Sequence, residues 1–103
     1  MDGQMKKGTL EMCILFQLYK KEMYGYEIMK IIKEAFLDVH EATVYAILRR
    51  LNADGYADTY IGKVSNGPKR KYYKITPSGK INLAESIQEW KAILSSVKDL
   101  GIE

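Results

Sequence analysis

Five cations and no acid lie between residues 63 and 74 of the chain, in a segment otherwise made of β-branched, aromatic and turn-forming residues. The cations are Lys63, Lys69, Arg70, Lys71 and Lys74. Such side chains pair with phosphate oxygens, and each phosphate neutralised releases counterions, so the binding weakens steeply with salt. Lysines also protect the edges of sheets. The segment by itself is as compatible with a solvated hairpin as with a phosphate-binding ribbon.

The segment before this hairpin offers a second group of residues with useful chemistry. A helix that reads the major groove needs short or flat side chains near its N-terminus and cations further along. Ala42, Thr43 and Tyr45 meet the first requirement, and Arg49 meets the second. Arg50 either holds a phosphate or pairs with an acid. An ordinary surface helix is the alternative interpretation.

The sequence contains few residues that could carry out catalysis. His40 and Cys13 are the single histidine and the single cysteine, and they fall in different predicted elements. A hydrolase or transferase would need a nucleophile with a base beside it, and no third member is at hand. No cluster of ligands predicts a metal site, and no glycine-rich loop predicts a phosphate cofactor. We therefore expect a protein that is not an enzyme and has no metal or cofactor.

The elements that must position these groups follow from the periodicity of the apolar residues. Residues 9–19 are apolar nearly all round, which predicts a helix buried on more than one side. Tyr24-Gly25-Tyr26 opens a second helix. A third is predicted over 41–53, where apolar residues recur at i, i+3, i+4 and i+7. Its inward stripe consists of Val44, Ile47, Leu48 and Leu51.

The pattern then changes to that of strands. Residues 57–64 and 70–76 are rich in β-branched and aromatic side chains, and Asn66-Gly67 between them favours a hairpin turn. Thr76-Pro77 starts a last, long helix, with threonine as the cap and proline in the first turn. This order predicts an α+β fold, mainly α: a winged helix-turn-helix with an additional long C-terminal dimerisation helix.

The last helix carries a seam of apolar residues with steps of 4, 3, 4 and 3, formed by Leu83, Ile87, Trp90, Leu94 and Val97. Such a heptad pattern favours contact with a second copy of the chain. Packing of the helix on its own domain is the alternative. The nearly all-apolar first helix favours the dimer, because it has more apolar surface than one small core uses.

The length, charge and cysteine count limit the number of domains and the expected location of the protein. The chain has 103 residues and a net charge of +3, which is room for one compact unit. We expect residues 1–76 to form the DNA-binding part and 77–103 the dimerisation helix. No apolar run approaches the roughly 18 residues of a membrane span. A single cysteine fits a reducing compartment, so the expected location is cytoplasmic.

Three segments in the same order resemble PadR-type transcriptional regulators. Residues 41–56, from Glu-Ala-Thr-Val-Tyr to Asp-Gly-Tyr, resemble their recognition helix, and Tyr24-Gly25-Tyr26-Glu27-Ile28 resembles the opening of their second helix. Residues 67–76 with Gly79 resemble their wing and the start of their C-terminal helix. The chain departs from the pattern at Val44, where leucine is commoner, and at Asn52, where glutamate is commoner.

The resemblance implies a sequence-specific DNA-binding regulator. The residues it places on double-stranded DNA are Lys6, Lys7, Tyr24, Gly25, Ala42, Thr43, Tyr45, Arg49, Lys69, Arg70 and Lys71. Members of the family repress genes as homodimers, and some respond to phenolic acids or flat aromatic drugs. The short form of this chain is similar to the multidrug-binding branch.

In that branch an aromatic residue at the place of Trp90 stacks on a planar ligand at the dimer interface. By the same resemblance Met5, Gly8, Met12 and Leu15 would line the same space. Trp90 is otherwise an interface anchor. The resulting hypothesis is a homodimeric repressor released by a small aromatic effector. The alternative is a ligand- or protein-binding winged-helix module that does not bind DNA.

Overall fold

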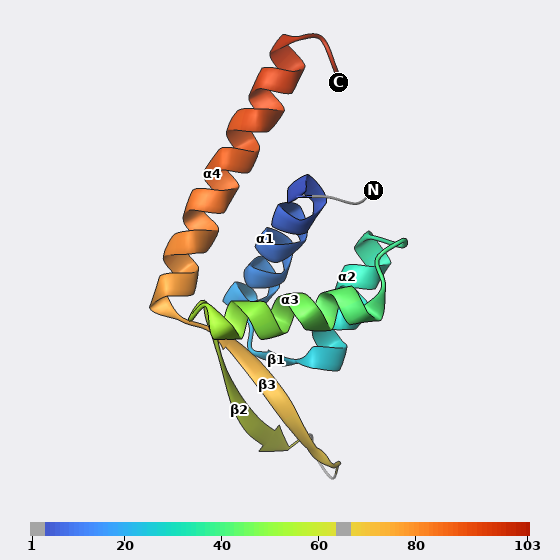
Figure 1. Cartoon of the computed structure of the whole chain (residues 1–103), viewed down its shortest axis with the longest axis vertical. Helices are drawn as coiled ribbons and strands as arrows, with labels where there is room; N and C mark the ends of the chain where they lie inside the picture. Colours follow the sequence, from blue (N-terminus) through green and yellow to red (C-terminus); the bar gives the residue numbers. More distant parts are fainter. Residues whose placement is uncertain (1–3, 64–66) are drawn as a thin grey trace.

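The computed structural model describes residues 4–63 and 67–103, with side chains from Lys6 onward. Three helices are followed by a β-hairpin and a long fourth helix (Figure 1). In chain order the elements are α1 (Gln4–Lys20), β1 (Met23–Tyr24), α2 (Gly25–Ala35), α3 (Glu41–Ala53), β2 (Ala57–Lys63), β3 (Lys69–Ile75) and α4 (Pro77–Asp99). The predicted winged helix-turn-helix order is confirmed.

Two features of this order were not predicted. α1 begins at Gln4, so the polar segment with Lys6 and Lys7 is helical rather than a lead-in. A short strand, β1, precedes α2. It pairs with β3 through Met23↔Tyr73 and Tyr24↔Tyr72, so the sheet has the antiparallel order β1-β3-β2. A strand of two residues is too short to show alternation in sequence.

β2 and β3 pair in register from Ala57↔Ile75 to Lys63↔Lys69, which confirms the predicted hairpin. The predicted turn residue Asn66 lies outside the described residues. At the base of the hairpin, the side-chain amide of Asn52 donates a hydrogen bond of 2.8 Å to the carbonyl of Ala57. A glutamate carboxylate at this position would have no proton to donate.

The core lies between the three N-terminal helices, the sheet and the first turns of α4. The stripe predicted on α3 is buried as expected, and the core also takes apolar residues from every other element. Its most deeply buried large side chains are Ile14, Leu15, Ile28, Ile32, Val44 and Leu48. With this stripe turned inward, the opposite face of α3 is left to solvent.

Gly55 and Thr76 bring the end of α3 to the start of α4. Gly55 has φ +80°, a conformation that glycine adopts without steric cost, so it ends α3 as predicted. The Thr76 hydroxyl donates to the Gly55 carbonyl at 2.7 Å and accepts from the Gly79 amide at 2.9 Å. A Cβ on Gly79 would lie 2.1 Å from the carbonyl oxygen of Tyr56, so only glycine fits there.

α4 continues well beyond α1, at the end of the molecule opposite the hairpin (Figure 1). Leu83 in its second turn is buried, and Ile87 packs against the same core. Further along, Trp90 is 43% exposed and Ile93 is 54% exposed. The molecule measures 53 × 29 × 21 Å as a result. Within the described residues, no helix is both long and apolar enough to span a bilayer.

Candidate nucleic-acid interface

The outer face of α3 carries short, exposed side chains at its N-terminal end. Ala42, Thr43 and Ala46 are exposed, and Arg49 follows one turn later on the same surface. Tyr45 is half-buried at the edge of this face. A helix with small residues at its start can enter a groove closely, because nothing bulky holds it away from the base edges.

A cleft of about 540 Å³ separates this helix from the hairpin. It is lined by β1, by the start of α2, by α3 and by β3, through Tyr24, Gly25, Tyr26, Tyr45, Arg70, Lys71 and Tyr73. Five of these seven were predicted to contact DNA, and residues from four elements thus meet at one place. Tyr26 and Tyr73 were missed, although Tyr26 stands beside Gly25 in the quoted segment.

Gly25 allows the close approach of α2 and α3. A Cβ at this position would lie 2.8 Å from Cε1 of Tyr45, closer than side chains tolerate. The Tyr45 ring therefore rests on the first residue of α2. Burial, Glu41 and Tyr26 all raise the pKa of the Tyr45 hydroxyl above its ordinary value. A phenol is already protonated at neutral pH without such a shift, so the hydroxyl can donate to an anion.

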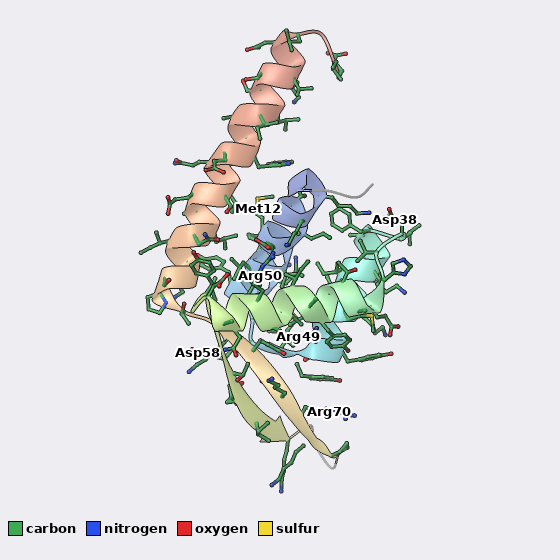
Figure 2. All side chains as sticks on the ribbon, viewed as in Figure 1. Met12, Asp38, Arg49, Arg50, Asp58 and Arg70 are labelled. Carbon is green, nitrogen blue, oxygen red and sulfur yellow. The ribbon has the colours of Figure 1, made fainter. Side chains whose placement is uncertain are left out.

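Arg49 and Arg50 are neighbours in sequence with different surroundings. Figure 2 shows them on opposite sides of the α3 ribbon. Arg50 forms an ion pair with Glu11 of α1, so the choice left open by the sequence is settled in favour of an acid. Arg49 is exposed and lies near Tyr73, whose pKa is raised by burial and lowered by the Arg49 charge. Arg49 is therefore the cation of this pair that faces the cleft side.

The cations of β3 lie over tyrosine rings. The Arg70 guanidinium is 5.7 Å from the ring centre of Tyr24, and the Lys71 ammonium is 5.8 Å from that of Tyr73. Among the described residues no acid forms an ion pair with Lys69, Arg70 or Lys71. Their charges are therefore available to an anionic partner.

Lys6, one of the residues expected to contact DNA, has an acidic partner within the chain. Its ammonium lies 2.6 Å from Oδ2 of Asp38, in the connection between α2 and α3, and its side chain is only 12% exposed. The same contact lowers the pKa of the Asp38 carboxyl. Lys6 therefore ties α1 to the helix-turn-helix through one of its three donors, and its expected phosphate contact stays a prediction. Lys7 is exposed beside it and stays a prediction.

The sequence model of the PadR-like family matches residues 14–85 of this chain, from the middle of α1 into α4. The match includes all the elements that line the cleft. The chain belongs to the PadR-like family of transcriptional regulators.

Relatives of known structure agree with this assignment over nearly the full chain. A PadR-like transcriptional regulator from Bacillus cereus is 37% identical, with a TM-score of 0.86 over 95% of this chain and 96% of the other. A Streptococcus transcriptional regulator is 29% identical, with a TM-score of 0.89 over 96% and 98%. An uncharacterized protein of Lysinibacillus sphaericus is 40% identical over 94% of this chain and 91% of its own.

The family consists of transcriptional regulators, which confirms the expectation that the chain is not an enzyme. Within the described part of this PadR-like regulator, no group of three or more metal-binding side chains occurs.

The seam predicted for dimerisation in this PadR-like regulator is divided between two environments. Leu83 is 4% exposed and Ile87 packs on the core, so both belong to the chain's own domain. Trp90 and Leu94 are 43% and 37% exposed, and Val97 is half-buried beyond them. The part of the seam that the chain's own domain leaves exposed therefore begins at Trp90.

The predicted effector residues are divided in the same way. Gly8 is exposed and Met12 is half-buried beside the core. Leu15 has no exposed surface, because it is packed inside the domain, so its expected place beside a ligand is wrong. The side chain of Met5 lies outside the described residues.

Proposed function

We propose that this PadR-like regulator binds duplex DNA sequence-specifically as a homodimer, with α3 in the major groove and the hairpin against the adjacent backbone. The cleft carries this proposal, because it joins the start of α2, Tyr45 and the unpaired cations of β3 on one surface. The phosphate backbone would run along the cleft between helix and hairpin. A regulator of this kind would act in the cytoplasm, where the DNA is.

The residues divide into two roles. Lys69, Arg70 and Lys71 are charged and exposed, so we assign them to phosphates, which all sequences share. Thr43 and Tyr45 lie at the N-terminal part of α3, where side chains reach base edges. Ala42 allows the helix to come close, and Tyr24 with Gly25 forms the wall of the cleft.

Binding to a set of duplexes tests this division. Arg70→Ala with Lys71→Ala should weaken binding to every duplex about equally, whereas Thr43→Ala or Tyr45→Ala should change the order of preference among them. Lys20→Ala with Lys80→Ala removes the same charge from exposed residues that line neither the cleft nor the seam of α4, and serves as the control. Equal, sequence-independent losses from all the interface variants would refute the division.

A protein- or ligand-binding module without DNA affinity is the rival function. It would leave the unpaired cations of β3 without a partner. Anisotropy with labelled duplex at low salt separates the two, because phosphate contacts are strongest there. Selection from a random pool then gives the site. Two half-sites about one helical turn apart would support both the dimer and the docking.

The homodimer rests on the exposed apolar residues of α4. Trp90, Ile93 and Leu94 are large side chains open to solvent on one helix, and covering each is worth roughly 1.5–3 kcal/mol. We expect Leu94→Lys to give a monomer in sedimentation equilibrium and to weaken DNA binding. Ile81→Lys, which changes an exposed residue off the seam, should leave the dimer intact. A wild-type chain that is monomeric at high concentration would refute the proposal.

The repressor and effector roles concern the same surface. Trp90 is exposed and flat, and Gly8 with Met12 lies on the neighbouring helix α1, a combination suited to stacking on a planar aromatic molecule. Such a molecule should quench Trp90 fluorescence and release the DNA. In a reporter carrying the selected site, it should restore expression that the protein lowers. Unchanged fluorescence with a panel of planar dyes would leave Trp90 a packing role.

A further inference from the structure

Three tyrosines form a row across one face of the sheet, at a single level of the register. Tyr24, Tyr72 and Tyr60 stand on β1, β3 and β2, and each pairs with the next across the strands. The rings of Tyr60 and Tyr72 stack at 5.3 Å with an angle of 12° between them. Tyr72 meets Tyr24 edge-on at 5.6 Å. The row thus connects all three strands through side chains.

Both ends of the row are held by charged groups. At the β2 end, the Tyr60 hydroxyl donates a hydrogen bond of 2.6 Å to the Glu22 carboxylate, which precedes β1. At the β1 end, the Arg70 guanidinium lies over the ring of Tyr24. Gly62 makes room for the row, because a Cβ there would lie 2.8 Å from the Tyr72 ring.

The hairpin needs such a support. Its base is fixed to α3 by the Asn52 bond to Ala57, but β1 joins β3 through only two residue pairs. Beyond these pairs β2 and β3 project from the rest of the molecule (Figure 1). The bond from Glu22 to Tyr60 reaches past β3 to the outer strand, so it resists rotation of the hairpin about the short β1 ladder.

We propose that Glu22 and Tyr60 are positioning residues for DNA binding, which set the angle of the hairpin and the place of Arg70 beside the cleft. The inference rests on the proposed function and extends it to residues that touch no phosphate. An acid near a DNA-binding surface ordinarily repels phosphate, so its removal would raise affinity. The positioning role predicts the opposite sign for Glu22.

The sign of the change in DNA affinity is tested by measuring Glu22→Ala, Glu22→Gln and Tyr60→Phe on one duplex. We expect Glu22→Ala and Tyr60→Phe each to weaken binding about 25-fold, which is about fivefold for the net hydrogen bond lost in each subunit of the dimer. Glu22→Gln keeps an acceptor oxygen and should stay within about twofold of the wild type. Glu85→Ala, an exposed acid on α4, is the control for lost charge.

Coupling to Arg70 completes the test. In an Arg70→Ala background, Glu22→Ala should have a smaller effect than in the wild type, because one of the cations that it positions is gone. The inference is overturned if Glu22→Ala and Glu22→Gln both raise affinity as Glu85→Ala does, or if Tyr60→Phe binds like the wild type. Melting curves for each variant show whether a loss of affinity comes from unfolding.

A second measurement needs no DNA. Residual dipolar couplings of the β2 and β3 amides, compared with those of α3, report the angle of the hairpin. They should change in Glu22→Ala and Tyr60→Phe and stay the same in Glu22→Gln. Unchanged couplings in all three variants would overturn the inference. A wild-type chain that binds no duplex would instead refute the proposed function, and the couplings would still decide the positioning role.

Discussion

The neighbouring arginines of α3 give the sharpest test of which face meets DNA. Arg49→Ala and Arg50→Ala remove the same charge one residue apart, so their long-range electrostatic effects are alike. Arg50 is paired with Glu11, whereas Arg49 has no partner acid among the described residues. We expect Arg49→Ala to lose DNA affinity and Arg50→Ala to lose a little stability.

The size of the Arg49 effect follows from two phosphate contacts per dimer. At about 1.5 kcal/mol for each charged hydrogen bond, Arg49→Ala loses about 3 kcal/mol, or roughly 150-fold in affinity at low salt. Each contact contributes about 0.9 to the slope of log K against log salt, so the slope falls by about 1.8. Between about 50 and 200 mM salt, the deficit should therefore shrink about twelvefold.

The Arg50 effect is smaller because its ion pair is partly open to water. Arg50 and Glu11 are 38% and 31% exposed, so the pair is worth about 0.5 kcal/mol after solvent screening. This corresponds to a fall in Tm of about 2–4 °C. Fluorescence anisotropy over a salt series and thermal melts measure the two effects. Equal loss of affinity with equal change of slope in both variants would refute the assignment of the outer face of α3.

Three further changes test the packing and the titration. Gly25→Ala should displace the Tyr45 ring at a cost of about 0.5–1.5 kcal/mol, offset by up to about 1 kcal/mol of helix propensity. The melting temperature should therefore stay near that of the wild type while the preference among duplexes changes, and an unchanged preference would contradict the prediction. Gly79→Ala forces a Cβ against the Tyr56 carbonyl and should cost about 2–3 kcal/mol in urea unfolding, whereas wild-type stability would show that the backbone yields. The Glu22 hydrogen bond raises the pKa of Tyr60 to about 12. The stability that this hydrogen bond contributes is therefore present below about pH 10 and lost as the pH rises through about 12. The titration of Tyr60 can be followed by ¹³Cζ NMR of labelled tyrosine, with the signal assigned by Tyr60→Phe. A titration midpoint near pH 10 would contradict the prediction.

Local chemistry was enough to predict most of the elements from the sequence. The inward stripe of α3, the Thr76-Pro77 start of α4 and the left-handed Gly55 each depend on residues within one or two turns. The hairpin could be predicted for the same reason, because its strands adjoin in sequence. The cations of the hairpin were visible as a run of like charge, which needs no knowledge of the fold.

The tertiary structure alone decided which polar groups are free. Lys6 meets Asp38 across 32 positions, and Tyr60 meets Glu22 across 38. Sequence patterns report the periodicity of one segment, whereas these pairs depend on the path of the chain between segments. The same reason explains why the sequence did not decide between the two roles of Arg50, and why β1 and the tyrosine row were not predicted. A charged residue reads the same in the sequence whether its side chain is paired or free, and only the neighbour that folding brings to it decides its role.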